Sequence, residues 1–172
     1  MSSFKPFRFI AGACVLLAVS GCGGGLNPNP GGNGPTTFSG RLSTNDFYDE
    51  DSDRYYDIFV TDAVDTDSAR VAMRSTDFDT QFYVYEKDSN GDYVLLDSND
   101  DAGSDTTDSE DSFRVSYGTT YRILATSSRA NERGDYEIRF SSELGRPAQV
   151  TSQDMALAKS ATKFSLPARA KK

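Results

Sequence analysis

Between residues 36 and 142, apolar residues alternate with polar ones in short runs, and clusters of Asp, Gly, Asn and Ser separate these runs. An alternation with a period of two places one side of an extended segment in a core and the other side in solvent. In the run 69–75, for example, Ala69, Val71 and Met73 share one side. The spacing of the runs predicts an all-β protein, either an antiparallel sandwich or a barrel, with about eight strands.

The expected strands share β-branched or aromatic residues at alternate positions and cover residues 37–42, 55–61, 69–75, 80–87, 92–97, 112–117, 120–127 and 135–141. Asn90-Gly91 stands between two of these runs and predicts a β-hairpin, because both residues tolerate positive φ. We expect Tyr83 and Tyr85 on the side of their strand opposite the core. We expect Tyr117 on the core side of the strand that contains it.

The first 21 residues are typical of a signal peptide. Lys5 and Arg8 precede an apolar run of eleven residues, Phe9 to Val19. That run is shorter than the roughly 20 apolar residues that cross a bilayer as a helix, and it suits the apolar part of a signal peptide. Residues 1–21 are therefore expected to be removed on export.

The segment Val19-Ser20-Gly21-Cys22 resembles the bacterial lipobox. The resemblance implies that the thiol of Cys22 receives a diacylglyceryl group and that Cys22 becomes the first residue of the mature protein. Two or more acyl chains give a stable membrane anchor. An aspartate directly after the lipidated cysteine resembles a signal for retention in the inner membrane, and this chain has Gly23 there. The outer membrane is therefore favoured over the inner membrane. The alternative is an ordinary secretory signal that happens to contain a cysteine.

The segments on either side of the β-domain differ from it in composition. Residues 22–35 are rich in Gly, Pro and Asn and are expected to form a flexible linker. Residues 144–172 carry six Lys and Arg against one Asp and are expected to be a largely disordered basic tail. For this tail, contact with anionic lipid or cell-wall polymer and docking on the acidic domain both remain open. These boundaries leave residues 36–143 as the folded domain.

The composition excludes several classes of function. The chain has no histidine, and its two cysteines, Cys14 and Cys22, both precede the domain. Ser-His-Asp and Cys-His catalysis and His-ligated metal sites are therefore excluded, which favours a protein that is not an enzyme. Residues 37–143 contain 25 Asp and Glu against 10 Lys and Arg. This charge disfavours nucleic acid as a partner.

Several short motifs follow one another through the domain. In chain order they are Ser39-Gly40-Arg41-Leu42, Tyr56-Asp57-Ile58-Phe59-Val60, Asp77-Phe78-Asp79-Thr80, Phe82-Tyr83-Val84-Tyr85, Asn90-Gly91, Asp100-Asp101, Asp111-Ser112-Phe113, Gly118-Thr119-Thr120-Tyr121-Arg122-Ile123 and Gly134-Asp135-Tyr136-Glu137-Ile138. Together they resemble the bacterial pre-peptidase C-terminal domain family. The resemblance implies a jelly-roll-like β-sandwich without enzymatic activity. It also implies a role beside a secreted hydrolase, in binding polymeric substrates, or in binding calcium.

Acidic residues cluster in three of the expected loops. In the family resemblance, the calcium positions fall near Asp77 and Asp79 and near Asp100 and Asp101, which makes these four aspartates the candidate calcium ligands. Calcium takes six to eight oxygen ligands, and clustered carboxylates supply them. The alternative is that these carboxylates are solvated loop residues that form local turns. The run 49–53 (DEDSD) is also expected to be a solvated loop.

These features together predict a non-catalytic cell-envelope lipoprotein. It is expected to be anchored by Cys22 and to present a β-sandwich to an extracellular protein or polymer. The alternatives are a calcium-binding structural module of an envelope assembly and an accessory subunit of a secreted hydrolase. Apart from the possible calcium ion, no cofactor is expected.

Overall fold

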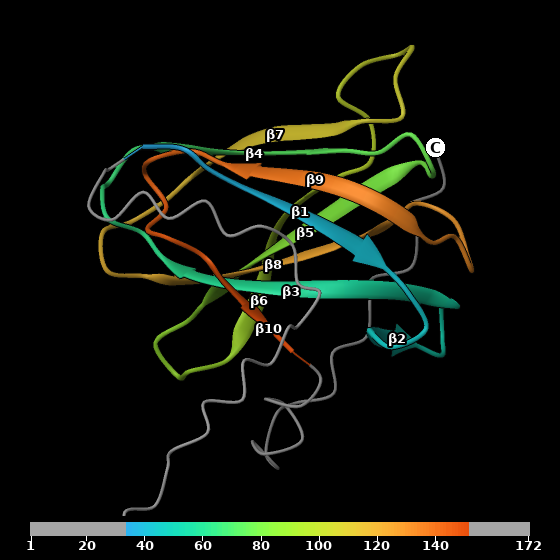
Figure 1. Ribbon diagram of the computed structural model, residues 1–172. Helices are drawn as coiled ribbons and strands as arrows, with labels where there is room; N and C mark the ends of the chain where they lie inside the picture. The colour runs from blue at the N-terminus through green and yellow to red at the C-terminus, as the bar shows by residue number, and fades with distance from the viewer. Residues whose placement is uncertain (1–33, 152–172) are drawn as a thin grey trace, which may run out of the picture.

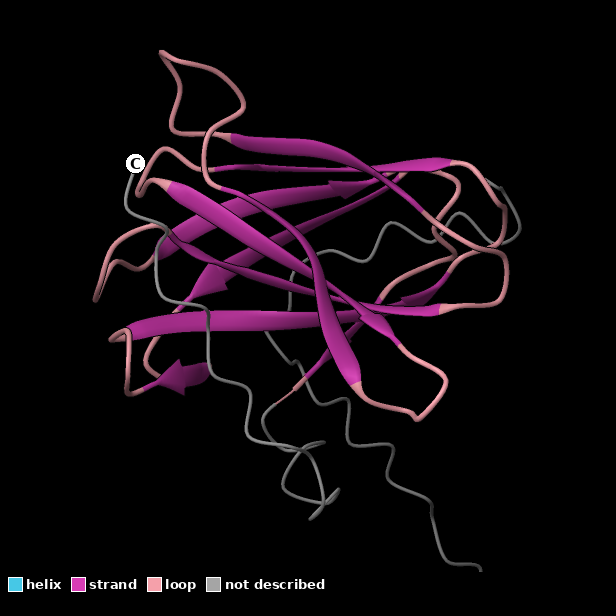
Figure 2. Cartoon of the chain, turned by 180° about the vertical axis from the view of Figure 1, so that it is seen from behind, coloured by secondary structure: helices cyan, strands magenta, loops and turns pink. Residues whose placement is uncertain are grey.

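The alternating runs form strands in the structure, a computed structural model that describes residues 34–151 (Figure 1). The strands are β1 (Thr36–Leu42), β2 (Phe47–Asp49), β3 (Arg54–Asp62), β4 (Ser68–Arg74), β5 (Thr80–Lys87), β6 (Tyr93–Asn99), β7 (Ser109–Arg114), β8 (Thr120–Ser127), β9 (Gly134–Phe140) and β10 (Ala148–Val150). Between residues 34 and 151 there is no helix, and hence none that is long and apolar enough to cross a membrane (Figure 2). The expected all-β class is confirmed.

Two antiparallel sheets pack face to face. One has the order β1-β9-β4-β7, and the other has the order β10-β3-β8-β5-β6, with β2 also paired to β3. In Figure 1 the four-stranded sheet lies above the six-stranded sheet. The chain passes from one sheet to the other seven times, and only the connections β2–β3 and β5–β6 stay within one sheet. The expected jelly-roll-like sandwich is thus confirmed as an antiparallel two-sheet sandwich, with ten described strands in place of about eight.

The core lies between the sheets and is rich in aromatic side chains. Phe59 of β3 and Phe140 of β9 are fully buried, and their ring centroids are 5.4 Å apart. Phe38 of β1 also contacts Phe59, and the two ring centroids are 5.3 Å apart. Val71 and Met73 of β4 belong to the same cluster, as the alternation predicts. Burial of these side chains is the main source of stability for a domain without disulfides.

The strand expected at 112–117 begins and ends three residues earlier in the structure, as β7. Ser109 is buried, and its hydroxyl lies 2.8 Å from that of Thr80. This hydrogen bond lets a polar residue enter the strand, because buried hydroxyls are stable when they are paired. Tyr117 falls outside the strand and is 76% exposed, so its expected place on the core side is wrong.

Two short strands, β2 and β10, were not expected from the sequence. They pair with successive parts of the same edge of β3, which places residues 148–150 inside the fold, beyond the expected boundary at 143. Leu144 is also buried. Asp49 of β2 is only 3% exposed and accepts a hydrogen bond from the Ser52 hydroxyl. The expectation that the whole run 49–53 is a solvated loop is therefore wrong at Asp49.

The hairpin expected at Asn90-Gly91 is confirmed, but its turn differs from the expected one. Lys87 pairs with Tyr93, which leaves a five-residue loop, 88–92. The Asp88 carboxylate accepts hydrogen bonds from the backbone N–H groups of Asn90 and Asp92, each at 2.9 Å. Gly91 has a φ of 91°, whereas Asn90 stays outside the left-handed region. Aspartates in loops often accept hydrogen bonds from backbone N–H groups of their own turn in this way.

Candidate functional site: a polar groove and the acidic loops

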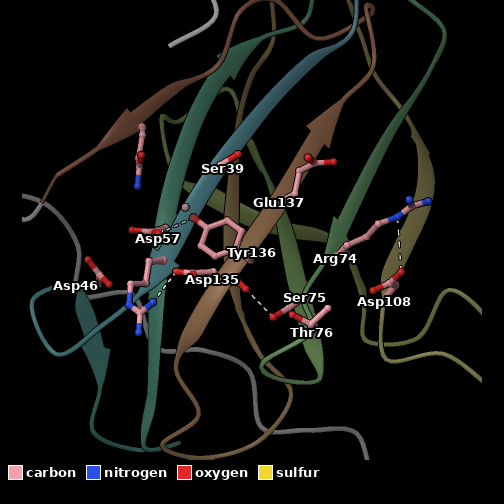
Figure 3. Close-up of a pocket in the computed structure, with 13 residues that line it drawn as sticks. Ser39, Asp46, Asp57, Arg74, Ser75, Thr76, Asp108, Asp135, Tyr136 and Glu137 are labelled. Carbon is pink, nitrogen blue, oxygen red and sulfur yellow. Dashed lines mark hydrogen bonds and ion pairs between the residues drawn. The ribbon is translucent and has the colours of Figure 1, made fainter. Parts of the chain in front are cut away.

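A groove of about 850 Å³ runs along the side of the sandwich where β1 and β9 approach β3 (Figure 3). Strands from both sheets line it, and so do the loops after β1 and after β4. The side chains that decide its chemistry are Arg41, Asp46, Asp57, Tyr136 and Gln149. All of them are polar, so the groove suits a ligand that forms hydrogen bonds.

Asp57 and Tyr136 form a buried polar contact at the base of this groove. Asp57 lies on β3 between the residues paired with β2 and those paired with β10. Tyr136 reaches it from β9 of the other sheet, and its hydroxyl donates a hydrogen bond of 2.5 Å to Asp57 Oδ2 (Figure 3). The two residues are 5% and 4% exposed. The contact therefore joins the two sheets beneath the groove.

Burial raises the pKa of Asp57 from an ordinary value of 3.8 to about 6. The hydrogen bond from Tyr136 lowers this pKa, the negative charge of Asp46 raises it, and a hydrogen bond with Gln149 lowers it. The pKa of Tyr136 is raised well above its ordinary value, first by burial and then by the charge of Asp57. Tyr136 thus remains a protonated donor, while Asp57 titrates close to neutral pH.

We expect Asp57→Asn to remove one component of the pH dependence of stability. Between about pH 4 and pH 6 the unfolded chain has lost the Asp57 proton while the folded protein keeps it, so this group's contribution falls as pH rises. The free energy of unfolding of the wild type, relative to Asp57→Asn, should fall by about 2 kcal/mol from pH 4 to pH 7. Urea unfolding at several pH values measures the difference. A difference that does not change with pH would contradict the assigned pKa.

Gly40 of β1 makes room for the Tyr136 ring. The two residues are paired in register, and a Cβ built on Gly40 would lie 2.4 Å from Tyr136 Cζ. No side chain fits there unless the ring moves. The backbone of β1 therefore sets the position from which Tyr136 reaches Asp57.

Gly40→Ala should displace the Tyr136 ring and lower the free energy of unfolding by about 1–3 kcal/mol, the usual cost of overpacking. Gly103→Ala is the matched control, because a Cβ there would meet nothing closer than 3.9 Å. Chemical denaturation of both variants gives the comparison. Equal stabilities for the two variants would show that the ring does not rest on Gly40.

The rim of the groove carries exposed charges of both signs. Arg41 pairs with Asp135 at 2.7 Å, and their side chains are 66% and 70% exposed. Arg74 pairs with Asp108 at 3.6 Å (Figure 3). Exposed ion pairs of this kind contribute at most about 1 kcal/mol. These charged groups can therefore exchange their partners for a ligand at little cost.

A second hollow, of about 360 Å³, continues the groove across the outer face of the four-stranded sheet. Arg74 and Glu137 line both hollows. Arg70, Glu110 and Arg139 line the second hollow alone. Together the two hollows form an elongated polar track, and we call this surface the polar track.

Asp77 and Asp79, two of the candidate calcium ligands, have partners within the protein. Asp77 Oδ2 accepts a hydrogen bond of 2.8 Å from the backbone N–H of Asp135. Asp79 Oδ2 accepts one of 2.8 Å from the Ser128 hydroxyl and lies 3.8 Å from Arg129. Asp79 Oδ1 is buried and has no hydrogen-bond partner. Asp77 thus organises a turn, and Asp79 retains one uncompensated oxygen.

The other two candidate ligands, Asp100 and Asp101, follow β6 and are partly buried. In the described part of the chain, no three acidic side chains lie close enough together to hold a metal ion. The four aspartates therefore do not share one site of three or more carboxylates. Calcium binding remains a prediction.

The structure places Tyr83 and Tyr85 opposite Phe82 and Val84, as expected from the alternation. Both tyrosines are nevertheless buried, with 2% and 6% exposure. Tyr48, by contrast, is 41% exposed. Tyr83 and Tyr85 therefore belong to a second buried cluster on that side of the sheet.

Comparison with known proteins does not assign this chain to a family. No protein-family model matches the sequence, and no curated protein gives a significant match. The resemblance to the pre-peptidase C-terminal domain thus rests on the motifs alone. The signal peptide (1–21), Cys22 and the end of the basic tail lie outside the described residues.

Proposed function

We propose that the protein is a non-catalytic cell-envelope lipoprotein, anchored through Cys22, whose sandwich binds an extracellular protein or polymer along the polar track. The proposal joins the lipobox of the sequence to the polar track of the domain. The outer membrane is the proposed location, because Gly23 follows the cysteine. The observation that carries the binding role is the continuity of the two hollows through Arg74 and Glu137.

The chemistry of the polar track favours an elongated, hydrogen-bonding ligand. Guanidinium groups, carboxylates and the hydroxyls of Ser39, Ser75 and Thr76 line its first part. Such groups recognise polysaccharide hydroxyls or an extended peptide backbone, since both present many donors and acceptors in a row. The absence of histidine from the sequence, and of cysteine after Cys22, supports binding over catalysis.

Site-specific photo-crosslinking in living cells tests this proposal. A photoreactive amino acid at position 137 lies in the polar track, and the same group at position 117 is the control, because Tyr117 is exposed and does not line either hollow. We expect one reproducible adduct from position 137 and none from position 117. An adduct with a secreted hydrolase would identify the accessory role. Equal labelling at both positions, or none at position 137, would contradict binding along the track.

Calcium binding is the second candidate function, and the buried unpaired Oδ1 of Asp79 is the observation that favours it. A buried carboxylate oxygen without a partner is costly, and a cation would offset that cost. The candidate predicts a melting temperature several degrees higher in calcium than in chelator, with no such rise in magnesium and none in Asp79→Asn. Identical melting temperatures in calcium and in chelator would contradict calcium binding.

A further inference from the structure

A second cluster of apolar side chains lies on the side of the six-stranded sheet that faces away from the core. It consists of Tyr56 and Ile58 of β3, Leu124 of β8, and Tyr83 and Tyr85 of β5. We call it the outer cluster. Its members are 0% to 6% exposed, so they are as deeply buried as the core between the sheets.

The described strands provide no second layer for the outer cluster. β2, β6 and β10 are neighbours within the plane of the same sheet, and the four-stranded sheet packs on its opposite side (Figures 1 and 2). A sheet face with three tyrosines, an isoleucine and a leucine needs a cover, since large apolar patches are seldom left in water. Phe47, Val60, Tyr93 and Val150 pack against the outer cluster from within the same sheet, so a further layer across its face would come from residues beyond 34–151 or from a second molecule.

We propose that the C-terminal segment, residues 152–172, docks across the outer cluster and forms the missing layer of the sandwich. The place where the described chain ends supports this assignment. β10 pairs with β3 on this sheet, and Val150, its last residue, packs against the outer cluster. The amino-terminal end enters the other sheet, where Thr36 pairs with Phe140 of β9.

The C-terminal segment is long enough for this role. Reaching β5 from β10 requires crossing three strand spacings, about 14 Å at 4.7–4.9 Å each. The segment has 21 residues, and an extended chain covers about 3.3 Å per residue. The segment can therefore cross the outer cluster even with a bend at Pro167.

Its composition also matches the face that it would cover. The segment contains Met155, Leu157, Phe164 and Leu166, together with five Lys and Arg against one Asp. Apolar side chains suit the outer cluster, and basic ones suit the acidic groups beside it.

Two aspartates and one arginine mark the polar end of the outer cluster. Burial, and the nearby charges of Asp100 and Asp49, raise the pKa of Tyr83, whereas Arg54 lowers it. Arg54 is itself buried, and its guanidinium donates hydrogen bonds of 2.5 Å to Gln81 Oε1 and 3.1 Å to the Tyr83 hydroxyl. The carboxylates of Asp49 and Asp100 therefore place negative charge near this end of the outer cluster.

The absence of tryptophan from the chain gives a clean test. Phe164→Trp places a single tryptophan in the C-terminal segment. The protein used is the mature chain, residues 22–172. It also carries Cys22→Ser, so that no lipid or detergent is needed. We expect emission at shorter wavelength than in urea and several-fold weaker acrylamide quenching. Tyr85→Lys should remove this protection, while Tyr117→Lys, at an exposed site, should leave it unchanged. Circular dichroism checks that both variants keep their strands.

Three results would overturn the proposal. The first is a tryptophan that acrylamide quenches equally in the folded and the unfolded chain. The second is protection that appears only at concentrations where sedimentation shows a dimer, which would assign the outer cluster to a second copy. A chain that stops after Thr151 gives an independent readout, since it should bind an apolar dye several-fold more strongly than the full mature chain. Equal dye binding would also contradict docking of this segment.

Discussion

Cys22→Ser should abolish the incorporation of labelled palmitate into the protein and prevent cleavage to the mature form. The serine hydroxyl does not accept the diacylglyceryl group that the lipobox thiol accepts, so the protein would lose acyl chains that each contribute about 0.8 kcal/mol per buried methylene. Metabolic labelling followed by immunoprecipitation measures both effects. The expected change is from full labelling to background.

Cys14→Ser provides the matched control for this prediction. Cys14 is the only other cysteine and lies within the apolar run of the signal peptide, before the lipobox. This variant should be labelled and cleaved like the wild type. Labelling that survives Cys22→Ser, or that is lost equally in both variants, would contradict lipidation at Cys22.

Phe59→Ala should lower the free energy of unfolding by about 3–5 kcal/mol, the usual cost of removing a buried phenyl ring. Phe59 is fully buried, and its ring lies against those of Phe38 and Phe140 at 5.3 Å and 5.4 Å. Those neighbours belong to different strands of the other sheet, so the cavity would open where the two sheets meet. Most single domains have a total stability of about 5–15 kcal/mol, so this variant should be near its unfolding threshold.

Urea unfolding followed by circular dichroism measures this loss. Tyr117→Ala is the control, because an aromatic ring that is 76% exposed contributes little, and surface changes usually alter stability by less than about 0.5 kcal/mol. A loss below about 1 kcal/mol for Phe59→Ala would mean that the sheets do not meet at this ring.

Local alternation was sufficient to predict most of the fold. The strand Thr80–Lys87 has the bounds expected from the sequence, and Ala69, Val71 and Met73 face the core as expected. These strands are long, and their apolar residues repeat every second position. Such a repeat fixes which side of a strand is buried without any knowledge of its neighbours.

The elements that the sequence did not predict depend on distant partners. β2 and β10 have three residues each, too few to show a repeat, and they exist because β3 offers a free edge to both. Ser109 enters β7 because Thr80, on another strand, pairs with its hydroxyl. Contacts of this kind become visible only when the chain has folded.

The same reasoning applies to the candidate sites. The family resemblance grouped Asp77 and Asp79 with Asp100 and Asp101, but Asp77 is hydrogen-bonded to the backbone of Asp135, which is remote in sequence. Asp57 could have been identified from the sequence as an unusual buried residue, because it is a charged residue on the same side of an apolar strand as Phe59. Its partner Tyr136 looked like an ordinary core residue, and nothing in the local sequence joins the two.

The mass of the amino-terminal peptide of the native protein tests the central claim most directly. The protein would be extracted from washed membranes, digested and analysed by mass spectrometry. We predict a peptide that begins at Cys22 and carries a diacylglyceryl group on its thiol, with no peptide from residues 1–21. A peptide that begins elsewhere, or a Cys22 with a free thiol, would contradict the proposal that this sandwich is held at the membrane by a lipid.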